Sequence, residues 1–195
     1  MSTGRPLRAD ARRNRERILQ AARTAFAAEG LGVPLDEIAR RAGVGPGTVH
    51  RHFPTKESLF EAVVVEHLEQ LTRDAQAALD ADEAGSAFFS FLARMMGEAD
   101  AKQDLADAIA GSGGGMGDAT QQVATGLRET FALLLARAQR AGTVRTDVDA
   151  EDVQAIVLAA VTAQRRRGDT ARPGRIAGLV LDCLRPGIPS GGSKS

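Results

Sequence analysis

Six side chains that can form hydrogen bonds lie between residues 48 and 56 of this 195-residue chain. A guanidinium group can donate two parallel bonds to guanine, and a threonine hydroxyl can bond to a base edge or touch a thymine methyl group. Ammonium, imidazole and hydroxyl groups suit the phosphates that flank the bases. The segment therefore has the chemistry to contact double-stranded DNA, through Thr48, His50, Arg51, His52, Thr55 and Lys56.

Two short helices joined by a tight turn would position these side chains. The first covers about residues 35–42, and Gly43 can adopt the left-handed conformation that a tight turn needs. The second runs from about Pro46 to Phe53, and Val49 and Phe53, four residues apart, form its inner face. This pattern is typical of a helix-turn-helix, which places its second helix in the major groove. The alternative is an ordinary exposed polar helix, which the surrounding motif disfavours.

The six side chains divide into two predicted roles. Thr48 and Arg51 are the expected base contacts, because their groups can distinguish base edges. The expected phosphate contacts are His50, His52, Thr55 and Lys56.

Other chemistry fits the sequence less well. His50 and His52 lie two residues apart, so they point apart on a helix, and no Cys or His has a suitable spacing to join them; we expect no metal site. The glycine run at residues 111–117 lacks the Gly-Lys-Ser/Thr signature of a phosphate loop. The C-terminal region has no His and no evident pair of nucleophile and base, so we expect neither an enzyme nor a cofactor.

The composition is that of a soluble globular protein, with 43% hydrophobic and 26% charged residues. No apolar run reaches membrane-spanning length, and the polar, basic N-terminus does not read as a signal peptide. A single cysteine, Cys183, excludes an intramolecular disulfide. We expect a cytoplasmic protein without membrane association.

The net charge of zero hides an uneven distribution. Residues 1–60 contain 11 of the 25 Lys and Arg residues but 6 of the 25 Asp and Glu residues, a balance of +5. A basic N-terminal third indicates that this part meets a polyanion. Arg5, Arg8, Arg12 and Arg13 form a basic arm that would follow the DNA backbone or enter the minor groove, the alternative being a solvated tail.

The periodicity of apolar residues predicts an all-α fold. Expected helices cover about residues 10–29, 35–42, 46–53, 56–80, 86–110, 118–141, 150–164 and 173–184. Asp10 or Asn14 is the expected cap of the first helix, and Pro34 is expected in the first turn of the second. Thr55 is the expected cap of the fourth, although the box with Ser58 is incomplete. Asp147 or Asp149 caps the helix that follows it.

Residues 15–63 resemble the DNA-binding domain of the tetracycline-repressor (TetR) family. Many ordered matches over about 50 residues carry this resemblance: Ile18-Leu19-Gln20-Ala21-Ala22, Phe26, Gly30, Asp36-Glu37-Ile38-Ala39, Ala42-Gly43-Val44, Gly47-Thr48, His52-Phe53-Pro54, Lys56 and Leu59.

The resemblance implies a homodimeric repressor that binds a palindromic operator and leaves it when a small molecule enters the C-terminal domain. It implies a helix-turn-helix domain at residues 1–60 (with a flexible basic arm at 1–9) and a helical bundle for effector binding and dimerisation at 61–185. Residues 186–195 read as a disordered tail. A DNA-binding architectural or activator protein without a ligand switch is the alternative. His50 stands where the family usually has tyrosine, and Val33-Pro34 replaces a capping Ser or Thr.

Two further sets of residues follow from the resemblance. A soft apolar cluster is either the plain core of the bundle or a pocket for an apolar effector, and we favour the pocket, lined by Phe88, Phe91, Leu92, Met95, Met96, Met116, Phe131 and Gln164. The apolar stripes of the last two helices pack either within one chain or across a two-fold axis, and we favour a dimer interface formed by Val153, Ile156, Val157, Ala160, Ile176, Leu179, Val180 and Cys183.

Overall fold

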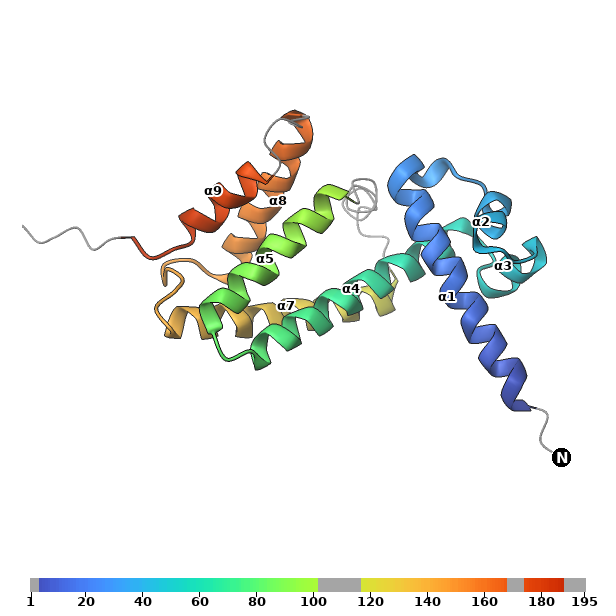
Figure 1. Ribbon diagram of the computed structural model, residues 1–195, viewed down its shortest axis with the longest axis horizontal. Helices are drawn as coiled ribbons and strands as arrows, with labels where there is room; N and C mark the ends of the chain where they lie inside the picture. The colour runs from blue at the N-terminus through green and yellow to red at the C-terminus, as the bar shows by residue number, and fades with distance from the viewer. Residues whose placement is uncertain (1–3, 102–116, 168–173, 188–195) are drawn as a thin grey trace, which may run out of the picture. The chain divides into compact units, whose positions relative to one another are not determined.

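The computed structural model describes residues 4–101, 117–167 and 174–187, which form eight α-helices and one 3-10 helix without a β-strand (Figure 1). The all-α prediction is confirmed. The chain divides into two compact units, one formed by residues 1–67 and 102–122, the other by residues 68–101 and 123–195. Within the described ranges no helix is both long enough and apolar enough to cross a membrane.

Helix α1 (Gly4–Glu29) begins earlier than the sequence predicted. Asp10 and Asn14 lie inside the helix, so the prediction that one of them caps it is wrong; Asp10 instead accepts a hydrogen bond from Arg13 one turn later. The apolar stripe is confirmed, since Ile18, Leu19, Ala22, Ala25 and Phe26 are all buried. Gly30 ends the helix with a positive φ of 71° and opens the 3-10 helix η1 (Gly30–Gly32).

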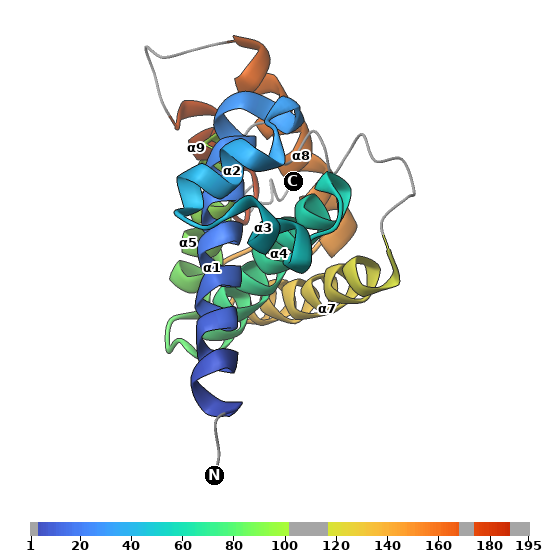
Figure 2. The same cartoon turned by 90° about the vertical axis from the view of Figure 1, so that its right-hand side faces the viewer.

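Helices α2 (Leu35–Ala42) and α3 (Pro46–His52) lie beside α1 in both ribbon views (Figures 1 and 2). Pro34 is the N-cap of α2, one position before the expected first turn, and supplies no side-chain cap. Gly43 ends α2 at φ 64°, and its N–H bonds to the carbonyls of Ala39 and Arg40. The left-handed turn predicted at this glycine is confirmed.

Helix α4 (Lys56–Asp80) starts from a reciprocal cap. The N–H of Ser58 donates to Thr55 Oγ1 at 3.1 Å, and the N–H of Thr55 donates to Ser58 Oγ at 3.2 Å. Thr55 is therefore the cap that the sequence predicted. The box is complete, because a serine hydroxyl at the third position replaces the usual Glu or Gln.

The second unit contains α5 (Ala84–Ala101), most of α7 (Asp118–Arg140), α8 (Ala150–Arg167) and α9 (Arg175–Cys183). Helices α5, α8 and α9 contact one another in pairs. Their core is apolar and rich in phenylalanine: the ring of Phe131 lies 6.1 Å from that of Phe88 and 6.2 Å from that of Phe91. The part of the expected helix 86–110 beyond residue 101 lies outside the described residues, as do most of the glycine run 111–117 and residues 188–195 of the tail.

Two polar features fix the ends of helices in this unit. Asp149 and Asp152 form the cap of α8 through reciprocal bonds of 2.9 and 3.1 Å, which decides between the two predicted caps. Arg137 of α7 donates to the carbonyls of Ala78, Ala81 and Asp82 at the end of α4. A cation at a helix C-terminus satisfies carbonyls that have no partner within the helix.

Candidate nucleic-acid interface

Helix α3 presents the side chains that the sequence assigned to base contact. Val49 is fully buried and Phe53 nearly so, which fixes the inner face of the helix as predicted. His50 and Arg51 are exposed, and Thr48 and His52 are half-buried. Arg51 Nε donates to the carbonyl of Gly47 at 3.0 Å, and Arg51 Nη2 lies 3.5 Å from Thr48 Oγ1. The two expected base contacts therefore lie together, toward the start of α3.

Thr55 and Lys56, the two expected phosphate contacts beyond α3, also have local structural roles. The hydroxyl of Thr55 caps α4, and Lys56 Nζ donates to the carbonyl of Leu31 in η1 at 3.0 Å. An ammonium group carries three donors, so Lys56 retains two for a phosphate.

Ion pairing separates the cations of the first unit into two groups. Five arginines bond to carboxylates, in the pairs Arg12–Glu16, Arg13–Asp10, Arg23–Glu66, Arg40–Glu37 and Arg41–Glu29. Among the side chains that the structure describes here, four cations have no carboxylate partner: Arg15, Arg17, Arg51 and Lys56. All four lie in α3 or contact the residues that flank it or the neighbouring η1. Among the described side chains of this unit, the cations without a carboxylate partner are therefore concentrated around the helix-turn-helix.

The carboxylate of Glu37 on α2 forms ion pairs with two arginines of the same helix, Arg40 and Arg41. Hydrogen bonds from Arg40 and Arg41 lower the pKa of Glu37 to about 2. Hydrogen bonds to Glu29 and Glu37 raise the pKa of Arg41. Glu29 is the last residue of α1, so this network ties the end of α1 to α2.

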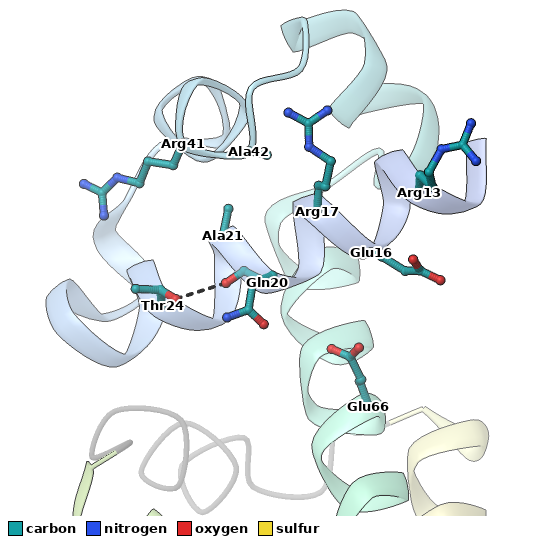
Figure 3. A pocket seen from close by; sticks show the side chains of 9 residues that line it. All are labelled: Arg13, Glu16, Arg17, Gln20, Ala21, Thr24, Arg41, Ala42 and Glu66. Atoms are coloured by element: carbon teal, nitrogen blue, oxygen red, sulfur yellow. Dashed lines mark hydrogen bonds between the residues drawn. The ribbon is translucent and has the colours of Figure 1, made fainter. Parts of the chain in front are cut away.

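An open groove of about 790 Å³ runs between α1 and α2 (Figure 3). Its lining carries charges of both signs, since Arg13, Arg17 and Arg41 face it together with Glu16 and Glu66. No local pattern in the sequence indicates this groove, because it depends on how two helices cross.

Comparison with known proteins identifies the fold and the motif. A family model described as bacterial regulatory proteins, tetR family, matches residues 18–63. A second model, described as the C-terminal domain of SbtR-like transcriptional regulators, matches residues 83–186, more than half of the chain. This chain belongs to the TetR family. Helices α2 and α3 are thus the DNA-binding helix-turn-helix of a TetR-family transcriptional regulator.

Solved TetR-family structures extend this similarity over nearly the whole chain. A TetR transcription regulatory protein from Mycobacterium vanbaalenii is 44% identical with a TM-score of 0.71, covering 93% of this chain and 100% of that one. The regulator SCO0520 from Streptomyces coelicolor is 33% identical with a TM-score of 0.72, covering 89% and 99%. FadR from Bacillus subtilis, solved in complex with stearoyl-CoA, is 18% identical with a TM-score of 0.65, covering 89% and 98%, and shares the fold alone.

Curated relatives described as HTH-type transcriptional regulators match about a third of this chain. The HTH-type transcriptional regulator TtgW from Pseudomonas putida, itself described as uncharacterized, is 40% identical over 67 residues, which are 34% of this chain. A regulator from Staphylococcus aureus (strain USA300) is 38% identical over 64 residues. The chain spans half the length of the first and 35% of the second.

The expected effector-pocket residues of this TetR-family chain lie in or beside the core of the second unit. Phe88, Phe91, Leu92, Met96 and Phe131 are buried, and Met95 packs against them. Gln164, on α8, is half-buried. Met116 lies outside the described residues. Both a bundle core and a closed apolar pocket produce this arrangement, so the pocket stays a prediction.

The expected dimer-interface residues divide between the inside and the outside of the bundle. Val153, Val157, Ala160 and Val180 are buried within the single chain, and Ile156 and Ile176 are half-buried, packed against the same core. Neighbouring helices of the same chain cover the four buried residues, as the alternative of packing within one chain requires, so their place in a dimer interface stays a prediction. Leu179, 57% exposed, and Cys183 do face outward. Leu158 of α8, 62% exposed, is an outward residue that the sequence reasoning missed.

No metal site is expected at His50 and His52, because their side chains point apart on a helix. Among the residues that the structure describes, no group of three or more His, Cys, Asp or Glu side chains could hold a metal ion.

Proposed function

We propose that this TetR-family protein is a homodimeric repressor that binds a palindromic operator and is released by a small apolar effector. The observation that carries the DNA-binding part is the concentration of Arg15, Arg17, Arg51 and Lys56 around α3, while the other described arginines of that unit are ion-paired. Cations without a carboxylate partner give the surface around the helix-turn-helix a positive potential that attracts the DNA backbone, and those among them that contact phosphates release counterions on binding. We place the protein in the cytoplasm, with the bacterial DNA that it regulates.

We propose that residues 1–60 bind DNA and residues 61–185 bind the effector and the second subunit. The boundary between the two compact units falls after His67. It therefore lies within the continuous helix α4, a few residues beyond the proposed boundary at residue 60.

The proposed dimer forms through the outward faces of α8 and α9. On α8 the exposed residues recur with helical spacing at Ala155, Leu158, Ala159, Thr162 and Ala163. Leu179 and Cys183 are exposed one turn apart on the neighbouring α9. Small residues around two exposed leucines allow close approach of a second pair of helices, and the same patch on both subunits gives an isologous four-helix interface.

The proposed effector is apolar because the buried side chains described in the second unit are all apolar and include Phe88, Phe91, Phe131 and Met96. Methionine adapts its shape to a ligand at low cost. FadR from Bacillus subtilis shows that a protein of this fold takes stearoyl-CoA. Long-chain acyl compounds therefore belong in a first ligand panel, beside aromatic and terpenoid hydrocarbons.

Selection from random duplex DNA tests the proposal. We expect enrichment of an inverted repeat whose half-sites are separated by about 34–36 Å or a multiple of it. Salt-sensitive retention without an enriched sequence would favour an architectural protein instead.

A thermal-shift screen tests the switch. A ligand at 100 times its dissociation constant stabilises the folded state by about 2.7 kcal/mol. An effector should both raise the melting temperature and release the selected duplex. Stabilisation without release would favour a DNA-binding regulator that lacks a ligand switch.

A further inference from the structure

Helix α3 is too short to be stable without contacts from the rest of the domain. It has seven residues and its N-cap, Gly45, supplies no side-chain hydrogen bond. Helices of this length are unstable alone, so contacts from outside must fix the helix. The buried side chains of Val49 and Phe53 hold its inner face, but rotation and tilt about that face need contacts at the two ends.

One arginine of α1 reaches the turn before α3. Arg17 Nη2 donates to the carbonyl of Gly43 at 3.1 Å, 26 residues away in the sequence. Gly43 is the left-handed residue that ends α2, and a Cβ added there would lie 2.5 Å from the same Nη2 atom. Figure 3 shows Arg17 extending from α1 beside Ala42 of α2. The guanidinium group thus holds the backbone at the point where the chain turns into α3.

A second arginine of α1 reaches the other end of α3. The guanidinium carbon of Arg15 lies 5.3 Å from the centre of the Phe53 ring, within the range of a cation–π contact. Phe53 directly follows α3 and its N–H bonds to the carbonyl of Val49, so its ring moves with the helix. Arg15 and Arg17, which we call the α1 arginine pair, therefore hold both ends of α3.

We infer that the α1 arginine pair positions α3 for sequence-specific binding, acting through Gly43 and Phe53 rather than on the DNA bases. The inference rests on the proposed operator binding and names two residues that set its specificity. The alternative is that Arg15 and Arg17 bind DNA phosphates directly instead of positioning α3. The two roles differ in their salt dependence, because a phosphate contact releases about one counterion and a contact within the protein releases none.

The experiment compares Arg15→Gln and Arg17→Gln with Arg23→Gln. Arg23 is a matched control, because it lies on the same helix and its loss removes the same charge, but it pairs with Glu66. Affinity for the selected duplex and for a scrambled duplex is measured at several salt concentrations, after thermal unfolding confirms that each variant is folded.

We expect each substitution to weaken the binding of one helix-turn-helix to the selected duplex about threefold. Because a dimer places two helix-turn-helix motifs on the duplex, its affinity should fall about tenfold. Scrambled-duplex affinity and the salt slope should match those of Arg23→Gln. Arg17→Lys, which keeps a donor for the Gly43 carbonyl, should restore most of the loss. A parallel loss on both duplexes with a shallower salt slope would overturn the inference in favour of phosphate contact.

A double-mutant cycle with Phe53→Leu tests the route of action. If Arg15 acts through the Phe53 ring, Arg15→Gln should have little further effect in the Phe53→Leu background. Fully additive losses would overturn the role of Arg15. Failure of the unaltered protein to prefer any duplex would instead refute the proposed function, so the two failures are distinguishable.

Discussion

At the scale of single residues, α3 is held by two sets of contacts. Val49 and Phe53, four residues apart, are buried beneath the helix, and Arg15 and Arg17 of α1 contact the residues at its two ends. The contacts of Arg15 and Arg17 join α1 to residues far along the chain. No local pattern indicates such partners, and both arginines would pass for solvated charges on an amphipathic helix.

Removing a base contact and removing a phosphate contact should have different signatures. Arg51→Ala and Thr48→Ala should relax the preference at particular bases, by about 1–3 kcal/mol for a paired arginine contact. Lys56→Ala should weaken binding to all sequences and lower the salt slope by about one. Selection and titration of each variant measure both quantities. Unchanged base preferences in the first two variants would contradict their assignment.

Glu37 should make stability depend on acid pH. Its pKa is lowered from 4.5 to about 2, so its stabilising effect is complete above about pH 4.5 and is lost as the pH falls toward 2. Glu37→Gln should therefore lower the melting temperature at pH 6 to 7, and its difference from the unaltered protein should shrink on acidification. Glu57→Gln, which removes an exposed carboxylate of α4, serves as the control. A difference independent of pH would contradict this role of Glu37.

At the scale of helices, the sequence predicted the number and order of the elements well, because apolar spacing and glycine or proline breaks are local signals. The start of α1 was missed. Residues 1–9 were expected to form a flexible basic arm, but α1 begins at Gly4, and Pro6 in its first turn loses no hydrogen bond. The pairs Arg12–Glu16 and Arg13–Asp10, spaced one turn apart, support the following turns.

Two glycines of the motif should respond in opposite ways to alanine. Gly43 has φ 64° and a Cβ there would meet Arg17, so Gly43→Ala should cost about 1–2 kcal/mol or more in unfolding free energy. Gly47 lies within α3 with open space around it, so Gly47→Ala should stabilise by about 0.5–1 kcal/mol. Urea unfolding measures both. Equal effects would show that backbone conformation at Gly43 does not limit stability.

Glu61 should stabilise the start of α7. Its Oε1 accepts bonds of 3.1 Å from the N–H of Gly117 and from the hydroxyl of Thr120, which is fully buried. Glu61→Ala would leave the buried hydroxyl without this acceptor, at a cost of about 1–3 kcal/mol. Glu61→Gln keeps an acceptor oxygen, so thermal unfolding should show a smaller loss. Equal losses in both variants would contradict the role of the acceptor.

At the scale of the whole molecule, periodicity identified the apolar stripes of α8 and α9 but not what covers them. Val153 and Leu158 are both apolar residues of α8, yet one is fully buried and the other is 62% exposed. That difference depends on where α5 and α9 pack against α8, and the sequence of α8 alone does not predict it. The periodicity therefore predicted which residues of these helices are apolar, but not which of them the same chain covers.

Charges on the outward leucines should separate the proposed dimer. Leu158→Glu and Leu179→Glu would each bury a carboxylate twice across a two-fold axis, at a cost on the order of 3 kcal/mol or more per charge. Sedimentation should show monomers, with loss of operator binding. Leu133→Glu on α7 is the control, because Leu133 is equally exposed, at 61%, but lies outside this face. Dimers in all three variants would contradict the interface.

Cys183 gives the unaltered chain a built-in chemical handle. It is the only thiol in the sequence, and it lies exposed one turn from Leu179. In the proposed dimer the second subunit covers this thiol, so a maleimide should react with the free subunit and only slowly with the assembly. The rate of labelling of the unaltered protein would then follow dissociation of the subunits, without any engineered mutation.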